Sequence, residues 1–152
     1  MEIKEDERAV MRGGAGTKIL IVLIVILSIL GVVVSSLALR EHFNTGSSPC
    51  DINDVWDCGA VNHSPYAVMF GVPVAVIGIL GYVLLAGLAA KFPWITVATA
   101  LVGVIFSLHL TRIEWKVLQV WCIYCVSSQA IITAIFLLAV TRALVVRNKA
   151  SQ

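Results

Sequence analysis

Four long apolar runs constrain this chain more than any other feature of its sequence. They cover residues 19–39, 67–90, 94–112 and 121–146. Each is close to the roughly 20 residues that a helix needs to cross a hydrocarbon core. With 59% hydrophobic and 13% charged residues, the chain is too apolar for a soluble domain of its size. We therefore predict an all-α membrane protein, a four-transmembrane-helix bundle, because lipid cannot satisfy open backbone groups.

The polar ends of the chain set the limits of this predicted domain. Residues 1–16 are polar and are expected to form a disordered cytoplasmic tail. Residues 17–147 then hold the bundle, and residues 148–152 form a second cytoplasmic tail. The first run is longer than the apolar part of an ordinary signal peptide, so we interpret it as an anchor that stays in place rather than a cleaved leader.

The basic residues predict the orientation of the bundle in the membrane. The chain has 11 Lys and Arg residues. One group lies at the two ends of the chain and between the second and third runs: Lys4, Arg8, Arg12, Lys18, Lys91, Arg142, Arg147 and Lys149. The opposite side holds only Arg40, Arg112 and Lys116. The positive-inside rule therefore predicts a multi-pass protein of the cell membrane with both termini in the cytoplasm. All four cysteines then lie on the extracytoplasmic side, where disulfides form and persist.

The Cys122-x2-Cys125 pair opens the fourth apolar run. Residues three apart lie on one face of a helix, with Cβ atoms about 5–6 Å apart. At a helix N-terminus, the partial positive charge of the helix stabilises a thiolate. A reactive dithiol is therefore the preferred interpretation of this pair.

The other two cysteines, Cys50 and Cys58, lie in the loop between the first and second runs. On a continuous helix their Cα atoms would stand about 12 Å apart, beyond the roughly 7 Å that a disulfide spans. Either the segment 51–57 turns back so that the two can bond, or Cys58 is free for another partner. The mixture of aspartates with Ile52, Val55 and Trp56 predicts a short amphipathic helix that lies over the bundle mouth.

Two other functions of the four cysteines compete with a redox role. They could form static disulfides that brace a structural membrane protein, or a zinc site, although the Cys50 and Cys58 pair lacks the spacing of a zinc knuckle. We expect no metal. None of the four runs contains Asp, Glu or Lys, so an ion or proton pathway is not indicated. The net charge of +2 and the scattered basic residues do not indicate nucleic-acid binding.

Taken together, these motifs resemble the vitamin K epoxide reductase family in its bacterial and archaeal four-helix form, a functional analogue of disulfide bond formation protein B. The matching residues are Cys50-x7-Cys58, Ser64 six residues later, the stretch 70–73 at the head of the second run, and Cys122-x2-Cys125. The resemblance covers nearly the whole chain.

The resemblance implies a quinone-linked membrane thiol–disulfide oxidoreductase. In that family pattern, Cys50 and Cys58 take electrons from an extracytoplasmic thioredoxin-like protein, Cys122 exchanges with Cys58, and Cys125 lies beside the quinone. Since the sequence ends at Gln152 without a thioredoxin-like domain, we expect a separate protein as this partner.

Three residues are expected to bind the quinone. The resemblance implies that Ser64 holds the quinone or the loop above it. Tyr66 and Phe70 could stack on a quinone ring, although aromatic residues are also common anchors at the membrane interface.

Two departures from the vertebrate vitamin K enzymes bear on the cofactor. Those enzymes have a tyrosine one turn after the CxxC, where this chain has Gln129, and an asparagine in the second helix, which this chain lacks. A membrane quinone of the ubiquinone or menaquinone type is therefore the expected acceptor. The alternative is a quinone or vitamin K epoxide reductase that runs on the same relay, and reduction potentials decide the direction of net electron flow.

Overall fold

The computed structural model describes the backbone of residues 2–46 and 48–151, and side chains from Gly14 onward. Its helices are α1 (Glu2–Phe43), α2 (Cys58–Asn62), α3 (Val74–Leu88), α4 (Pro93–Ile113) and α5 (Ile123–Ala150). A 3₁₀ turn, η1 (Pro65–Ala67), and a short antiparallel hairpin of β1 (Val68–Met69) and β2 (Val72–Pro73) lie between α2 and α3. A π-helical turn, η2 (Glu114–Leu118), extends α4.

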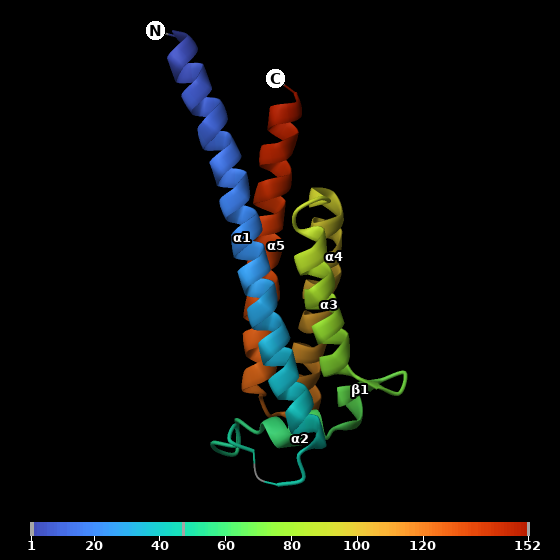
Figure 1. The fold of residues 1–152 in the computed structure, drawn as a ribbon. Coiled ribbons are helices and arrows are strands. Elements are labelled where there is room, and N and C mark those ends of the chain that lie inside the picture. Colours follow the sequence, from blue (N-terminus) through green and yellow to red (C-terminus); the bar gives the residue numbers. More distant parts are fainter. Residues whose placement is uncertain (1, 47, 152) are drawn as a thin grey trace.

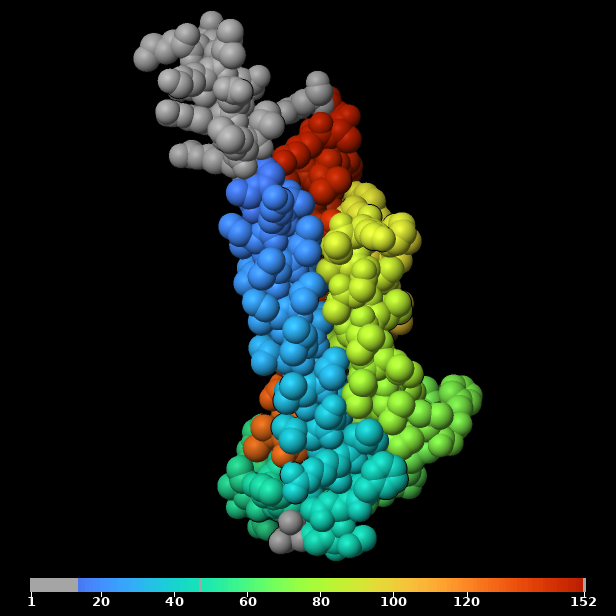
Figure 2. Space-filling model, in the orientation of Figure 1, coloured from blue at the N-terminus to red at the C-terminus, as the bar shows by residue number. Residues whose placement is uncertain are grey.

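The four longer helices form a bundle in which α5 packs against α1 and α4, and α1 also packs against α3. Both ends of the chain lie at one end of this bundle (Figure 1). The loop after α1, the short helix α2 and the hairpin lie at the opposite end, and the hairpin projects from the side of the molecule (Figure 2). The bundle therefore has one end made of helix termini and another that carries the loops.

Length and composition make this a multi-pass membrane protein. Three helical segments are long and apolar enough to cross a bilayer: Gly14–Phe43, Pro93–Leu118 and Ile123–Ala150. The fourth apolar helix, α3, is shorter, at 15 residues. Large hydrophobic side chains point outward along the bundle, such as Ile19 and Ile105, each 59% exposed. Lipid suits such a surface better than water does.

Inside the bundle, small residues pack against large ones. Tyr82 of α3 is buried, and a Cβ added to Gly31 of α1 would come within 2.5 Å of its ring. The Tyr82 hydroxyl reaches α5, where it contacts Ser128 O at 2.9 Å and Ser128 Oγ at 2.8 Å. One aromatic residue thus ties three helices together, and the absence of a side chain at Gly31 makes room for it.

The second apolar run becomes a helix later than the sequence predicts. Helix α3 begins at Val74 instead of residue 67, because the hairpin occupies residues 68–73. The turn of the hairpin has positive φ angles at Phe70 (53°) and Gly71 (80°), a backbone form that glycine adopts at low cost. Pro73 is the N-cap residue of α3 and makes no side-chain capping hydrogen bond. The stretch 70–73 is therefore a hairpin before the helix and not the first turn of the helix.

The loop between α1 and α3 also differs from the amphipathic helix predicted over the bundle mouth. The segment 51–57 is irregular, and the helix α2 begins only at Cys58. The Asp57 side chain caps it by accepting a hydrogen bond from Ala60 N at 2.7 Å. Aspartate side chains that accept hydrogen bonds from nearby N–H groups compete with helix formation. This explains why the segment before Cys58 is not helical.

The remaining boundaries lie close to the predicted ones. Helix α4 and its extension cover the predicted third span, and α5 begins at Ile123 and continues to Ala150, past the predicted end at residue 146. The disordered tail expected over residues 1–16 falls mostly on residues whose side chains are not described, and it stays a prediction.

Candidate active site

The first cysteine pair closes a tight loop at the end of the bundle that carries the loops. Cys50 and Cys58 form a disulfide, with their Cα atoms 5.6 Å apart. Both are buried. The segment 51–57 therefore turns back on itself, which was one of the two arrangements that the spacing left open.

The Asp51 carboxylate fastens this loop at both ends. It accepts hydrogen bonds from Ser48 N at 3.0 Å and from Gly59 N at 3.1 Å. Burial by itself would raise the pKa of Asp51, but the hydrogen bonds from these N–H groups outweigh it, so the pKa lies below its ordinary value of 3.8. The carboxylate form thus holds together the two chain segments that carry Cys50 and Cys58.

The second pair lies at the start of α5. Cys122 is the N-cap residue of this helix, with extended backbone angles, and Cys125 lies in its first turn. Both are free thiols; Cys122 is fully buried and Cys125 is partly exposed. Cys122 lies just outside the membrane-length part of α5, and the pKa of its thiol is lowered, mainly by a hydrogen bond with the Cys125 side chain. Burial and the nearby Glu114 charge act in the opposite direction.

A short backbone pairing brings the two pairs together. Trp121 N donates to Val55 O at 2.8 Å, and Asp57 N donates to Trp121 O at 3.1 Å. These bonds form a parallel bridge between Trp56 and Trp121. Cys58 and Cys122 each follow a residue bonded in this bridge, and both belong to one buried cluster with Cys50 and Val61. Segments far apart in the sequence are therefore packed together, and they bring cysteines of both pairs into one buried cluster.

Asn62 connects Cys58 and Cys122 more directly. Its side-chain amide donates to Cys58 O at 2.9 Å and contacts Cys122 Sγ at 3.6 Å. The backbone carbonyl oxygen of Asn62 contacts His42 Nδ1 of α1 at 2.6 Å. Asn62 is itself 7% exposed. A buried amide is thus placed where it can stabilise a thiolate at Cys122.

Glu114 approaches the second pair from the other side. It lies in η2, only 2% exposed, and its Oε2 accepts a hydrogen bond from Cys122 N at 3.3 Å. The Cys125 thiol also interacts with the carboxyl group. Its other oxygen, Oε1, is buried without a hydrogen bond of ordinary length among the described residues.

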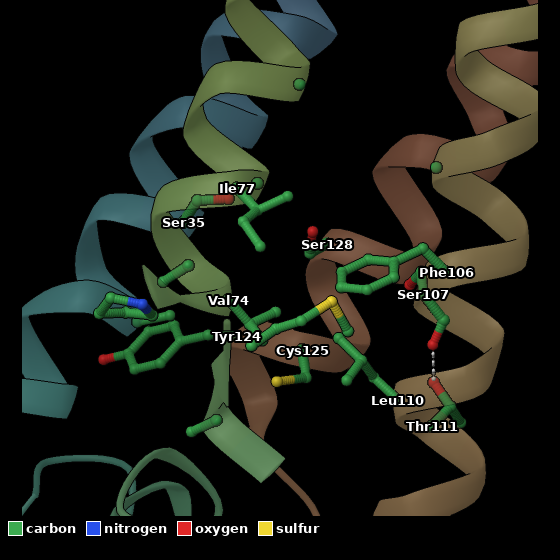
Figure 3. A pocket seen from close by; sticks show the side chains of 18 of the residues that line it. Ser35, Val74, Ile77, Phe106, Ser107, Leu110, Thr111, Tyr124, Cys125 and Ser128 are labelled. Carbon is green, nitrogen blue, oxygen red and sulfur yellow. Dashed lines mark hydrogen bonds between the residues drawn. The ribbon is translucent and has the colours of Figure 1, made fainter. Parts of the chain in front are cut away.

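A cavity of about 470 Å³ opens beside Cys125. Its walls come mainly from α3, α4 and α5 and are largely apolar, with Val74, Ile77, Phe106 and Leu110 among them. Figure 3 shows Cys125 among these side chains, and Ser107 of α4 and Ser128 of α5 line other parts of the same cavity. Glu114 also lines the cavity, whereas Cys122 does not. The volume and the lining are those of a site for a small apolar molecule.

The structure separates the three residues expected to bind a quinone. Ser64 and Tyr66 line the cavity, and the Ser64 hydroxyl donates to Val61 O at 2.7 Å, which holds the end of α2. Phe70 does not line the cavity; it is at the tip of the hairpin and 99% exposed. Gln129, at the position of the vertebrate tyrosine, accepts a hydrogen bond from Ser107 and so links α5 to α4.

Sequence reasoning missed two of the polar residues around the cysteines. Glu114 falls just beyond the predicted third span, so a search of the spans for acidic residues did not include it. Asn62 matches a glycosylation pattern in the sequence but is buried. The spacing of Glu114, eight residues before Cys122, is the signal that could have identified it, because a short turn after a helix brings such residues together. Among the described residues, no group of three or more potential metal-binding side chains is found.

Comparison with known proteins gives one family. The model of the vitamin K epoxide reductase family matches residues 22–140, which include all four cysteines, Asn62 and Glu114. No curated protein matches the chain.

Proposed function

The chain belongs to the vitamin K epoxide reductase family, and from that premise we propose that it is a quinone-linked membrane thiol–disulfide oxidoreductase. The observation that carries the proposal is the contact between the two cysteine pairs. The bridge between Trp56 and Trp121 places Cys58 and Cys122 in one buried cluster, and Cys125, which packs against that cluster, lines an apolar cavity. A chain of thiols leading to an apolar site is the arrangement that electron transfer to a membrane quinone requires.

Electrons pass through this arrangement by two disulfide exchanges. An external dithiol reduces the Cys50–Cys58 disulfide and becomes a disulfide itself. The Cys58 thiolate then attacks Cys122 of an oxidised Cys122–Cys125 pair, and Cys125 leaves as a thiolate. Cys50 attacks Cys58 of the resulting Cys58–Cys122 disulfide, which restores the first disulfide and leaves both thiols of the second pair reduced. This step leaves one bonded pair and two free thiols, and in the structure Cys50 is bonded to Cys58 while Cys122 and Cys125 are free.

The residues of the cavity fit a quinone ring. Apolar side chains of α3 and α4 would cover its faces, and Ser64 and Tyr66 would lie near its edge on the side of the loops. When bound, the quinone supplies the acceptor for two electrons. The chain contributes the reduced Cys125 thiol at the wall of the cavity, an environment that excludes water, and the polar groups that surround the thiol. A ubiquinone or a menaquinone suits this lining.

We also propose that α3 crosses the membrane, which gives four spans. Its 15 residues rise about 22 Å along the helix axis, short of a typical hydrocarbon core, and the apolar residues of the preceding hairpin add to its length. With the basic residues placed inside, both termini lie in the cytoplasm. The cysteine loop and the start of α5 then face the extracytoplasmic side, where a separate thioredoxin-like protein would reach Cys50.

The first alternative is a quinone or vitamin K epoxide reductase that runs on the same relay. The second, of another class, is a structural membrane protein braced by disulfides. The free thiols of Cys122 and Cys125 beside a bonded first pair favour a relay, because a static brace would use both pairs.

Trapping the intermediate disulfide tests the proposal. A chain with Cys50→Ala and Cys125→Ala retains the two cysteines that should exchange, and after mild oxidation we expect mass spectrometry to find a Cys58–Cys122 disulfide. A control chain with Cys58→Ala and Cys125→Ala retains Cys50 and Cys122 and should cross-link more slowly. In parallel, the native chain in detergent should reduce a quinone analogue when a reduced thioredoxin-like protein is supplied. No cross-link, together with no quinone reduction, would leave the disulfide-braced structural protein as the better conclusion.

A further inference from the structure

Glu114 has a buried carboxyl group whose two oxygens accept few hydrogen bonds. Only 2% of the residue is exposed, Oε2 accepts one hydrogen bond from Cys122 N, and Oε1 has none of ordinary length. No cation pairs with it in the part of the chain that the structure describes, and the basic residues nearest in sequence, Arg112 and Lys116, are exposed. Because desolvating an unpaired carboxylate is costly, such a residue is unlike a structural anchor.

The groups around Glu114 indicate a chemical role for this residue. The titratable groups that act on it are the thiols of Cys122 and Cys125. Glu114 also lines the cavity together with Cys125. The carboxyl group therefore lies beside the reacting thiols and borders the cavity where a quinone would bind. Thr111 and Ser107 of α4 line the same cavity, so Glu114 is its acidic side chain among mostly apolar and hydroxyl groups.

We propose that Glu114 transfers protons between the Cys122 and Cys125 thiols and the cavity. The inference rests on the proposed function and adds to it a residue for the protons, whereas the four cysteines account only for the electrons. A positioned carboxyl group within reach of the reacting atoms is a suitable general acid and base.

The proton and electron balance requires such a group. When the two thiols form the Cys122–Cys125 disulfide, two S–H bonds break, one S–S bond forms, and two electrons and two protons are released. A quinone takes up both electrons and both protons to become a quinol. The Glu114 carboxylate accepts one thiol proton as the sulfur becomes a nucleophile, delivers it to the cavity side, and is then free to accept the second.

A purely structural role makes a different prediction. If Glu114 only capped the backbone N–H of Cys122, a glutamine would serve as well, because its side-chain oxygen accepts the same hydrogen bond. A proton carrier must instead titrate. Glu114→Gln separates the two roles, because it keeps size and hydrogen bonding and removes the titration.

The test begins with a readout that needs no quinone. In a chain with Cys50→Ser and Cys58→Ser, the ultraviolet absorbance of the thiolate reports only on Cys122 and Cys125 as the pH changes. The Glu114 charge opposes ionisation of Cys122; without it, we expect thiolate to form at a pH lower by roughly one unit. In the chain with all four cysteines, we expect Glu114→Gln to lower the rate of quinone reduction on the order of a hundredfold.

Two further variants control for folding. Glu114→Asp keeps a titratable group and should recover part of the quinone reductase activity. Glu41→Gln changes another buried carboxyl, which is bonded to Asn44 and lies outside the cavity and the cysteine cluster; it should change neither readout. Suppose that Glu114→Gln leaves the pH of thiolate formation unchanged and the rate of quinone reduction within threefold of native. The proton role is then overturned, and the relay stands. If the native chain itself reduces no quinone, the proposed function fails instead.

Discussion

The two cysteine pairs are held by opposite means. The Cys50–Cys58 pair depends on a loop whose shape is set by side chains that bond to backbone N–H groups, chiefly through Asp51. The Cys122 and Cys125 pair lies at the start of a 28-residue helix, α5, which packs along α1 and α4. A pair on a loop can change partners and meet a protein from outside, whereas a pair on a fixed helix can keep its position beside a cavity. This difference fits the proposed roles, in which the first pair exchanges with an external dithiol and the second pair passes electrons to a quinone.

The strongest test of this comparison removes Cys125. We expect Cys125→Ala to reduce quinone reduction to the uncatalysed background with any thiol donor, because its sulfur is the one of the pair that lines the cavity. Cys50→Ala should also block a thioredoxin-like donor but should retain part of the activity with a small dithiol that enters the cavity. Quinone absorbance, followed with each donor, measures both. Equal losses with both donors for both variants would contradict the division of roles.

A second test acts on the contact between the pairs. Asn62→Leu removes the amide that bonds to Cys58 O and contacts Cys122 Sγ, and its loss should slow exchange between the pairs by about tenfold, equivalent to roughly 1.4 kcal/mol. Stopped-flow thiol trapping measures the exchange rate. Asn44→Ala, which changes a partly buried asparagine bonded to Glu41, is the control. The same rate in both variants would show that Asn62 only supports the loop.

A third test disturbs the helical scaffold and leaves the loop alone. Gly31→Ala places a Cβ within 2.5 Å of the Tyr82 ring, while Gly81→Ala meets nothing within 4 Å. We expect the first to lower the free energy of unfolding by about 1–3 kcal/mol and to weaken quinone reduction, since Tyr82 lines the cavity. The rate at which a donor reduces Cys50–Cys58 should stay the same in both variants. Thermal unfolding in detergent and donor oxidation measure these effects.

The smallest effect concerns the pH dependence of the loop. The folded-state pKa of Asp51 is below 3.8, so its carboxylate stabilises the loop at all pH values above the unfolded value, and this support is lost as the pH falls through the folded value. Asp51→Asn should remove the pH-dependent part and make Cys50–Cys58 reducible a few-fold faster at neutral pH. Asp54→Asn, in the same loop, is the control. A disulfide reduced at the same rate in both variants would mean that Asp51 does not hold the loop.

Much of the site could be read from the sequence because it depends on local spacing and on bulk composition. The apolar runs predicted the long helices, and Cys122-x2-Cys125 predicted a pair at a helix start. The head of the second run was predicted wrongly, because apolar residues with β propensity fit a helix and a hairpin equally well. The positive φ angles of Phe70 and Gly71 show that this stretch forms the turn of a hairpin and not the first turn of a helix.

The sequence by itself determined that this is a chain of long apolar helices with four cysteines, since hydrophobic length and cysteine spacing are local properties. Only the tertiary structure decided which groups surround those cysteines. The bridge between Trp56 and Trp121 and the buried amide of Asn62 bring together segments that the chain separates by about sixty residues. The turn after α4 buries the unpaired carboxyl of Glu114 beside the same cysteines. Such contacts depend on how the loop folds back over the bundle, because hydrogen bonds between distant segments leave no periodic pattern in either segment.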